Sequence, residues 1–98
     1  MFTVYVLYSL KDKHTYVGCT NNIDKRLEEH NLGRVPSTKQ RRPLRLVYQE
    51  NLEDEHEAFL KEKHYKSSWG RRRLKKILGD LNMINSKNFQ KIFYKKII

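Results

Sequence analysis

Two segments in the N-terminal third of the chain have side chains that alternate in character with the two-residue period of a β-strand. Residues 2–9 are rich in Val, Tyr and Phe, and residues 15–19 resume the alternation after a polar turn over residues 11–13. This period is typical of strands, because successive side chains of a strand point to opposite faces of the sheet. The pattern predicts two paired strands at the N-terminus.

A helical spacing follows the second of these segments. Ile23 and Leu27 are four residues apart, which places them on one face of a helix over residues 23–31. Either Asn21 or Asn22 can cap the N-terminus of this helix through its side-chain oxygen. The third element of the chain is therefore expected to be a short helix.

The second half of the chain repeats this change from strand to helix. After Gly33, which is placed to end the first helix, a basic loop leads to a third strand over residues 44–48. A longer helix is expected over residues 53–67, Gly70 breaks the pattern, and a short basic helix follows over residues 71–78. The order β-β-α-β-α-α predicts an α/β protein of the α+β type, with a small three-stranded antiparallel sheet flanked by helices.

The chain is expected to consist of one domain and a tail. Residues 1–80 suffice for one domain with a modest core, and residues 81–98 form a basic tail that retains apolar side chains. Phe89, Ile92 and Phe93 recur at a helical spacing, so a short amphipathic helix is expected there. The sequence leaves open whether this tail packs on the domain, forms a dimer contact or frays, and it does not give the oligomeric state.

The charge of the chain indicates a polyanionic partner. Lys and Arg outnumber Asp and Glu by 21 to 11 in 98 residues, which gives a formal net charge of +10. Nucleic acid is the simplest partner for such a balance, although ribosomal proteins and non-specific binders share it. The composition therefore indicates a class of partner and not an activity.

The single cysteine and the lack of a long apolar run narrow the class of protein further. Cys19 alone excludes an internal disulfide and a cysteine-based zinc cluster, and it fits a reducing cytoplasm. No apolar run approaches the ~20 residues that span a membrane, and the chain opens in a strand pattern without a charged leader. We therefore expect a cytoplasmic protein with no signal peptide and no membrane partner.

Two polar side chains interrupt the inward face of the first helix. His30 lies almost on the stripe of apolar residues and Arg26 lies at its edge, so both face the strands that carry Tyr5 and Tyr16. A buried guanidinium needs an anion or an open cleft, and the planar fork of Arg can bind two phosphate oxygens. This group of side chains predicts a site for a phosphodiester.

A carboxylate interrupts the inward face of the second long helix in the same way. Glu62 is expected on one face with Ala58, Tyr65 and Trp69. A single carboxylate suits Mg²⁺, which keeps most of its water ligands and takes others from substrate phosphate. Metal-assisted hydrolysis of a phosphodiester is therefore chemically available to this chain.

The joint order of these motifs resembles the GIY-YIG endonuclease superfamily, in particular its small stand-alone members related to the nuclease domain of the UvrC excision-repair protein. The resemblance covers about residues 2–79. The features that carry it are the Thr-Val-Tyr and Tyr-Val-Gly signatures at residues 3–5 and 16–18, then Arg26, His30, and the segment around Glu62. Thr3 and Val4 stand in place of the Gly and Ile of the first signature. The late Asn of many catalytic members has no recognisable counterpart, since Asn82, Asn85 and Asn88 lie in the tail.

The resemblance implies a divalent-metal-dependent endonuclease that acts on DNA, in repair or processing. Glu62 would hold one Mg²⁺ or Mn²⁺ ion, and Arg26 would stabilise charge on the phosphate. Tyr5 would be the general base, His30 would help to take up its proton, and Tyr16 would position the water or the phosphate. A phenol with a pKa near ~10 is a weak base, so Arg26 and the metal must lower the pKa of Tyr5.

Basic side chains outside this group are expected to track the phosphates of a nucleic acid. No acidic residue occurs between residues 31 and 49. Contacts of this kind are independent of base sequence, so recognition of structure is expected over recognition of sequence. The residues predicted to make them are Arg34, Lys39, Arg41, Arg42, Lys66, Arg71, Arg72 and Arg73.

Each candidate also has a structural interpretation. Tyr5 and Tyr16 can be packing aromatics of a sheet, His30 a buried core histidine, and Glu62 an ion-pair partner of Arg26. If these interpretations hold, the chain is a nucleic-acid-binding module of the same fold without activity. The sequence does not decide between DNA and RNA as the partner.

Overall fold

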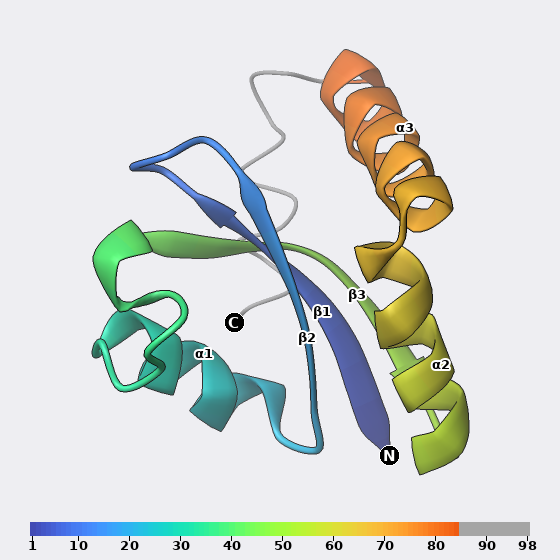
Figure 1. Cartoon of the computed structure of the whole chain (residues 1–98), viewed down its shortest axis with the longest axis horizontal. Helices are drawn as coiled ribbons and strands as arrows, with labels where there is room; N and C mark the ends of the chain where they lie inside the picture. Colours follow the sequence, from blue (N-terminus) through green and yellow to red (C-terminus); the bar gives the residue numbers. More distant parts are fainter. Residues whose placement is uncertain (85–98) are drawn as a thin grey trace.

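The computed structural model describes residues 1–84, and the side chains of residues 1–79. Three strands and three helices follow one another in the predicted order β-β-α-β-α-α (Figure 1). The elements are β1 (Phe2–Ser9), β2 (Thr15–Thr20), α1 (Ile23–Asn31), β3 (Leu44–Leu52), α2 (Glu55–Lys66) and α3 (Ser68–Ile84), with a 3-10 turn at Lys39–Arg41 before β3. The predicted α+β class is confirmed.

The sheet has β1 in its centre. Its strand order is β2-β1-β3, and both pairs are antiparallel. Tyr5 in the middle of β1 is paired with Gly18 of β2 and with Gln49 of β3. The outer edge of β2 is therefore free of strand pairing within the described residues.

The alternation of β1 supports two separate clusters of buried side chains, one on each face of the sheet. Val4 and Val6 pack with side chains of α2 and α3, whereas Tyr5 and Leu7 pack with β3 and with apolar residues of α1. Figure 1 shows α1 on one side of the sheet and α2 and α3 on the other. The free edge of β2 consequently lies between a helix on either face.

The start and end of α1 follow from its capping residues. The side chain of Asn22 accepts a hydrogen bond from the backbone N–H of Lys25 at 3.1 Å. Gly33 follows the helix with a φ of +76°, a left-handed conformation that glycine adopts without a steric cost. Both predicted signals are confirmed.

The prediction that Gly70 breaks the helical pattern is wrong. Gly70 lies in the first turn of α3, directly after α2 has ended at Lys66. A Cβ atom at this position would lie 2.6 Å from the Cα of Tyr65 and closer still to the carbonyl oxygen of His64. The glycine therefore allows the two helices to approach each other closely.

The end of α2 also changes the position of Trp69. This side chain was predicted on the buried face with Ala58 and Tyr65, yet it is 76% exposed. Because α3 starts at Ser68, Trp69 no longer follows the helical spacing of α2. The helix α3 also continues to Ile84, past its predicted end and across the predicted domain boundary at residue 80.

The predicted amphipathic helix of the tail, with Phe89, Ile92 and Phe93, lies outside the described residues. Among the residues that are described, no helix has both the length and the apolar character needed to cross a membrane.

Candidate active site

The phenol of Tyr5 lies inside the protein, against the neighbouring strand. Its side chain is 1% exposed, and Gly18 is its partner across the β1–β2 ladder. A Cβ atom at position 18 would overlap the ring and hydroxyl of Tyr5. The glycine of the Tyr-Val-Gly signature is thus needed because the phenol of Tyr5 occupies the space of a side chain at that position.

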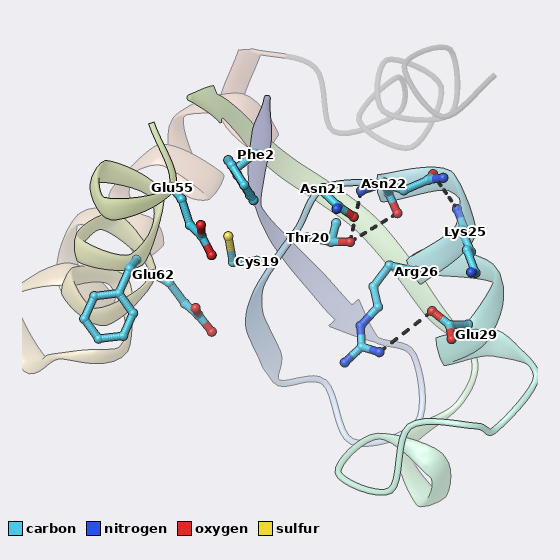
Figure 2. Close-up of a pocket in the computed structure, with 11 residues that line it drawn as sticks. Phe2, Cys19, Thr20, Asn21, Asn22, Lys25, Arg26, Glu29, Glu55 and Glu62 are labelled. Atoms are coloured by element: carbon cyan, nitrogen blue, oxygen red, sulfur yellow. Dashed lines mark hydrogen bonds and ion pairs between the residues drawn. The ribbon is translucent and has the colours of Figure 1, made fainter. Parts of the chain in front are cut away.

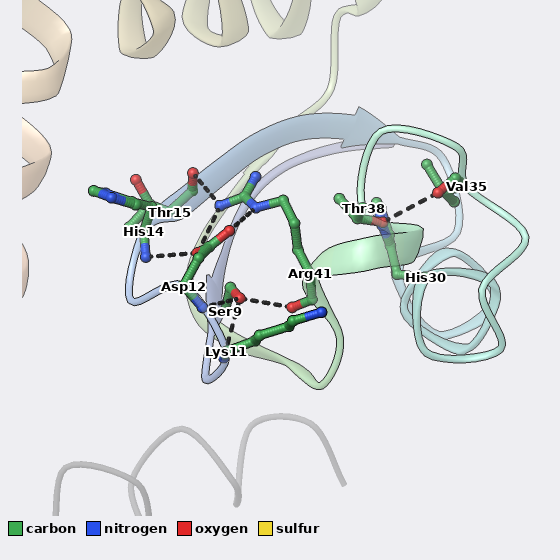
Figure 3. A network of polar contacts seen from close by, with 9 residues as sticks. All are labelled: Ser9, Lys11, Asp12, His14, Thr15, His30, Val35, Thr38 and Arg41. Carbon is green, nitrogen blue, oxygen red and sulfur yellow. Dashed lines mark hydrogen bonds and ion pairs between the residues drawn. The ribbon is translucent and has the colours of Figure 1, made fainter.

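His30 connects this phenol to the loop after α1. Its ring is fully buried, with Nε2 2.9 Å from the hydroxyl of Tyr5 and Nδ1 2.7 Å from Oγ1 of Thr38. Thr38 donates its own proton to the carbonyl oxygen of Val35 at 3.5 Å (Figure 3). The Thr38 oxygen is then left to accept from Nδ1–H, so in the neutral ring Nε2 accepts from Tyr5.

The other two predicted residues of this group lie beside the same hydroxyl and ring. Nε of Arg26 donates a long hydrogen bond of 3.4 Å to the Tyr5 oxygen, and its guanidinium also lies 3.8 Å from Glu29. The ring of Tyr16 meets that of His30 edge-on, with 5.3 Å between the centroids. Tyr5, Tyr16, Arg26 and His30 therefore form one connected cluster.

Arg26 opens from this cluster into a cleft of about 520 Å³ at the end of β2. Figure 2 shows Arg26 reaching into the cleft from α1, and Glu55 and Glu62 reaching into it from α2. Cys19 lies between them on β2. The cleft thus has Lys25, Arg26 and Glu29 on the wall that α1 forms and two carboxylates on the wall that α2 forms.

Burial controls the protonation of the two central groups. Burial, with smaller contributions from the nearby Tyr16 and Glu62, raises the pKa of Tyr5 to about 12 against the opposing hydrogen bond from Arg26. Burial, together with the positive charge of Arg26, lowers the pKa of His30 to about 4. His30 is therefore neutral near pH 7 and its Nε2 lone pair is available. Arg26 lowers the pKa of Tyr5, but not enough to offset burial.

The carboxylates of α2 are the groups that fit a divalent cation. Glu62 is an ion-pair partner of Lys66 at 2.8 Å, one helical turn away. Across residues 1–79 there is no cluster of three His, Cys, Asp or Glu side chains suited to a metal ion. Glu55 and Glu62 line one cleft and are donors of the kind that Mg²⁺ or Mn²⁺ takes, since these ions bind through one or two carboxylates and complete their shells with water and phosphate.

Two side chains of the site escaped the sequence analysis. Glu55 lines the cleft with Glu62, and their separation of seven positions, about two helical turns, is a signal that could have revealed it. Thr38 orients His30 from an irregular loop, for which no periodicity exists. Only the folded path of that loop brings the Thr38 hydroxyl to the ring.

The predicted nucleic-acid contacts fall into different environments. Arg41 is not a free surface cation: its Nε lies 2.5 Å from Asp12, and it also donates to the carbonyl oxygen of Thr15 (Figure 3). This pair holds the pKa of the Asp12 carboxyl well below its usual range. Arg41 thus joins the turn of the hairpin to the loop before β3.

The remaining basic candidates are exposed but do not share one face. Arg34, Lys39 and Arg42 lie on the loop after α1, where Arg42 donates to the carbonyl oxygen of Lys39. On α3, Arg72 stacks on Trp69 with 5.7 Å from its Cζ to the ring centroid. Arg73 lies near enough to Tyr48 to affect the pKa of the Tyr48 phenol. Lys66 and Arg71 line a second groove, separate from the cleft that contains Glu62.

Comparisons with known proteins give sequence matches over most of this chain. The sequence model of the GIY-YIG catalytic domain matches residues 1–77. A UPF0213 protein of Clostridium perfringens is 35% identical over 96 residues, which cover 97% of this chain and 95% of the relative. A UPF0213 protein of Limosilactobacillus reuteri is 34% identical over 80 residues, which cover 79% and 82% of the two chains. A solution NMR structure of a UPF0213 protein from Bacillus halodurans, 31% identical, superposes with a TM-score of 0.49 over 79% of this chain and 85% of that chain.

Proposed function

Because this chain belongs to the GIY-YIG family, we propose that it is a divalent-metal-dependent endonuclease that hydrolyses phosphodiester bonds of DNA. The observation that carries the proposal is the buried series of hydrogen bonds from Tyr5 through His30 to Thr38, next to the guanidinium of Arg26. A packing tyrosine needs no such series. A general base does, because its proton must have a defined destination.

The hydrogen bonds of the cluster support one path for the proton. A water held in the cleft attacks phosphorus and gives its proton to the Tyr5 oxygen, while the proton of Tyr5 passes to Nε2 of His30. Thr38 holds Nδ1–H, so His30 becomes an imidazolium only in this step. Arg26 stabilises the charge that develops on the phosphate oxygens as the P–O bond to the leaving oxygen breaks. The leaving oxygen takes up a proton from a solvent water, and His30 afterwards returns its proton through Tyr5 to solvent.

The metal would bind at Glu62, with Glu55 on the same wall of the cleft. When bound, it supplies positive charge at the phosphate and lowers the pKa of groups beside it. The raised pKa of Tyr5 supports a need for such charge, because Arg26 alone does not offset burial. Tyr16 orients the ring of His30 and borders the space for the water or the phosphate.

The substrate that we propose is DNA with an irregular structure, in repair or processing. The exposed cations of the loop after α1 and of α3 supply contacts that do not depend on base sequence. The relation to the UvrC nuclease domain and the cytoplasmic location are predictions from the sequence. RNA is a second substrate to be measured in the same assays.

One observation favours a second candidate, a nucleic-acid-binding module without activity. Lys66 already neutralises Glu62 at 2.8 Å, as an ion pair without a metal would. In such a module the charge of Glu62 would oppose the binding of phosphate, so its removal would leave affinity unchanged or raise it.

A cleavage assay distinguishes the two candidates. Plain, nicked, flapped and branched DNA are incubated with Mg²⁺ or Mn²⁺ and with wild type, Glu62→Gln or Glu57→Gln, the last being an exposed carboxylate on the opposite side of α2. We expect Glu62→Gln to lower metal-dependent cleavage by roughly 100-fold or more and Glu57→Gln to leave it unchanged. Titration of Mn²⁺ by electron paramagnetic resonance should show the same loss of binding in Glu62→Gln alone.

Two results would contradict the proposal, the first for the role of Glu62 and the second for the activity itself. Equal cleavage by wild type and Glu62→Gln would remove Glu62 from the site. Tight binding without cleavage, on every substrate and with either metal, would establish the non-catalytic module instead.

A further inference from the structure

A second groove of about 750 Å³ lies along β2, next to the cleft that holds Arg26 and Glu62. We call it the α3 groove. Its walls come from the turn and first half of β2 and from the junction of α2 with α3. The cationic side chains that line it are Lys13, Lys66, Arg71 and Lys75, with His14 beside them, and none of its lining residues is acidic.

The two hollows share two of their supporting elements, β2 and α2. The end of β2 lines the cleft and its beginning lines the α3 groove, while Glu62 of α2 belongs to the cleft and Lys66 to the groove. The ion pair between Glu62 and Lys66 lies where they meet. The six residues of β2 span about 20 Å, so the hollows together follow the free edge of the sheet for that length.

We propose that the α3 groove binds the phosphate backbone of the nucleic-acid strand that flanks the bond to be cut. The proposal rests on the nuclease function proposed above and adds the path of the substrate. Lys13, Arg71 and Lys75 are exposed cations that attract a polyanion, and Lys66, which is paired with Glu62, lies at the boundary of the groove. At about 3.4 Å of axial rise per phosphate, a length of about 20 Å accommodates roughly six phosphates. The strand would then run from Arg26 past Tyr16 toward Lys75.

Only some of the cationic side chains of α3 line the groove. Arg71, Leu74, Lys75 and Leu78 line it, and their spacing of three and four residues places them on one side of the helix. Lys76 is about 100° away around the helix from Lys75 and does not line the groove. Arg72 is turned toward Trp69. Lys75 and Lys76 thus carry the same charge and differ in that only Lys75 lines the groove, so Lys76 is a matched control.

The test compares Lys75→Gln with Lys76→Gln, each of which removes one charge from an exposed position. Affinity for a labelled flap DNA is measured with metal chelated, between 50 and 200 mM salt. Because a phosphate contact contributes about 0.9 to the salt slope, we expect Lys75→Gln to weaken binding several-fold and to reduce that slope by about one. Lys76→Gln should retain the wild-type affinity and slope, and Arg71→Gln should behave like Lys75→Gln.

The outcomes separate this inference from the function on which it rests. Equal losses in Lys75→Gln and Lys76→Gln, or no loss in either, would overturn the groove while wild-type cleavage still supported the nuclease. Wild-type protein that neither binds nor cuts nucleic acid would overturn both. Thermal unfolding of each variant, expected to match wild type because both lysines are exposed, ensures that the comparison concerns binding.

Discussion

For a single residue such as Tyr5, burial has two opposite consequences. It raises the pKa of the phenol to about 12, which makes loss of the proton harder. It also keeps His30 neutral and aligned 2.9 Å from the hydroxyl, which gives that proton a place to go. We infer that the site works by transfer of the proton within the cluster and not by a phenolate that exists before the substrate binds.

Removal of one oxygen atom tests this inference. Tyr5→Phe should lower kcat by roughly 10²- to 10⁴-fold, the usual contribution of a positioned acid or base, and leave DNA affinity nearly unchanged. The measurement is single-turnover cleavage together with binding in the absence of metal. Tyr8→Phe serves as the control, since Tyr8 lies on the same strand but packs on the opposite face of the sheet.

The two tyrosine variants also decide between catalysis and packing. If Tyr5 only packed in the sheet, Tyr5→Phe would cut DNA as fast as Tyr8→Phe does. A loss of the hydroxyl leaves Nε2 of His30 without its partner and costs about 1–3 kcal/mol of stability. Circular dichroism must therefore show that the variant is folded at the temperature of the assay.

Among the elements, the junction of α2 and α3 gives the sharpest prediction. Gly70→Ala places a methyl group against the backbone of His64 and Tyr65, so it should destabilise the protein by about 1–3 kcal/mol or more. Gly79→Ala on the same helix meets no atom within 4 Å and should stabilise it by about 1 kcal/mol. Urea unfolding measures both free energies. A Gly70→Ala variant that is as stable as wild type, or more stable, would show that the two helices are not in close contact at Gly70.

The sequence predicted the elements better than their ends. The two-residue period of β1 and the Asn22 cap are set by residues that are close together in the sequence, so both could be predicted from it. Gly70 has two possible meanings, an interruption or a close contact, and only the neighbouring helix decides between them. Trp69 was misplaced for the same reason.

The candidate site was predictable to the extent that its members belong to regular elements. Tyr5, Arg26 and His30 could be assigned to faces from strand and helix spacing, and the structure brings them together. Thr38 could not be found, because it reaches His30 from an irregular loop. Arg41 was predicted to contact nucleic acid because of its positive charge, and no pattern in the sequence indicated its ion pair with Asp12.

In the whole molecule, α1 and α2 lie on opposite faces of the sheet, and side chains of both line one cleft at its edge. Arg26 comes from α1 on one face and Glu62 from α2 on the other, and both reach the cleft at the end of β2. This arrangement brings a cation and a carboxylate together although 36 residues of sequence separate them. The division between a domain over residues 1–80 and a tail remains a prediction, with α3 crossing the boundary.

The stability of the whole molecule should depend on pH through His30. Its pKa falls from an ordinary value of 6.5 to about 4 on folding, because burial disfavours the charged ring. Above pH 6.5 the ring is neutral in both states. Between pH 6.5 and 4 only the unfolded chain takes up the proton, so stability should fall by about 3 kcal/mol over that range and lose no more from this group below it.

Urea unfolding at a series of pH values measures this dependence. Carboxylates such as Asp12 also lose stabilising contacts at low pH, but they do so equally in a variant that lacks the imidazole. His30→Gln should therefore show a weaker dependence than wild type between pH 6.5 and 4. Parallel curves for the two proteins would mean that His30 is protonated in the folded state.

The exposure of Trp69 has a practical consequence for these experiments. It is the only tryptophan of the chain, and at 76% exposure its indole is already surrounded by water in the folded protein. Its fluorescence emission should consequently change little when the protein unfolds, and tyrosine signals or circular dichroism are the better measures of unfolding. The same indole, stacked against Arg72 at the start of α3, is a built-in fluorescent probe for any molecule that docks on that side of the helix.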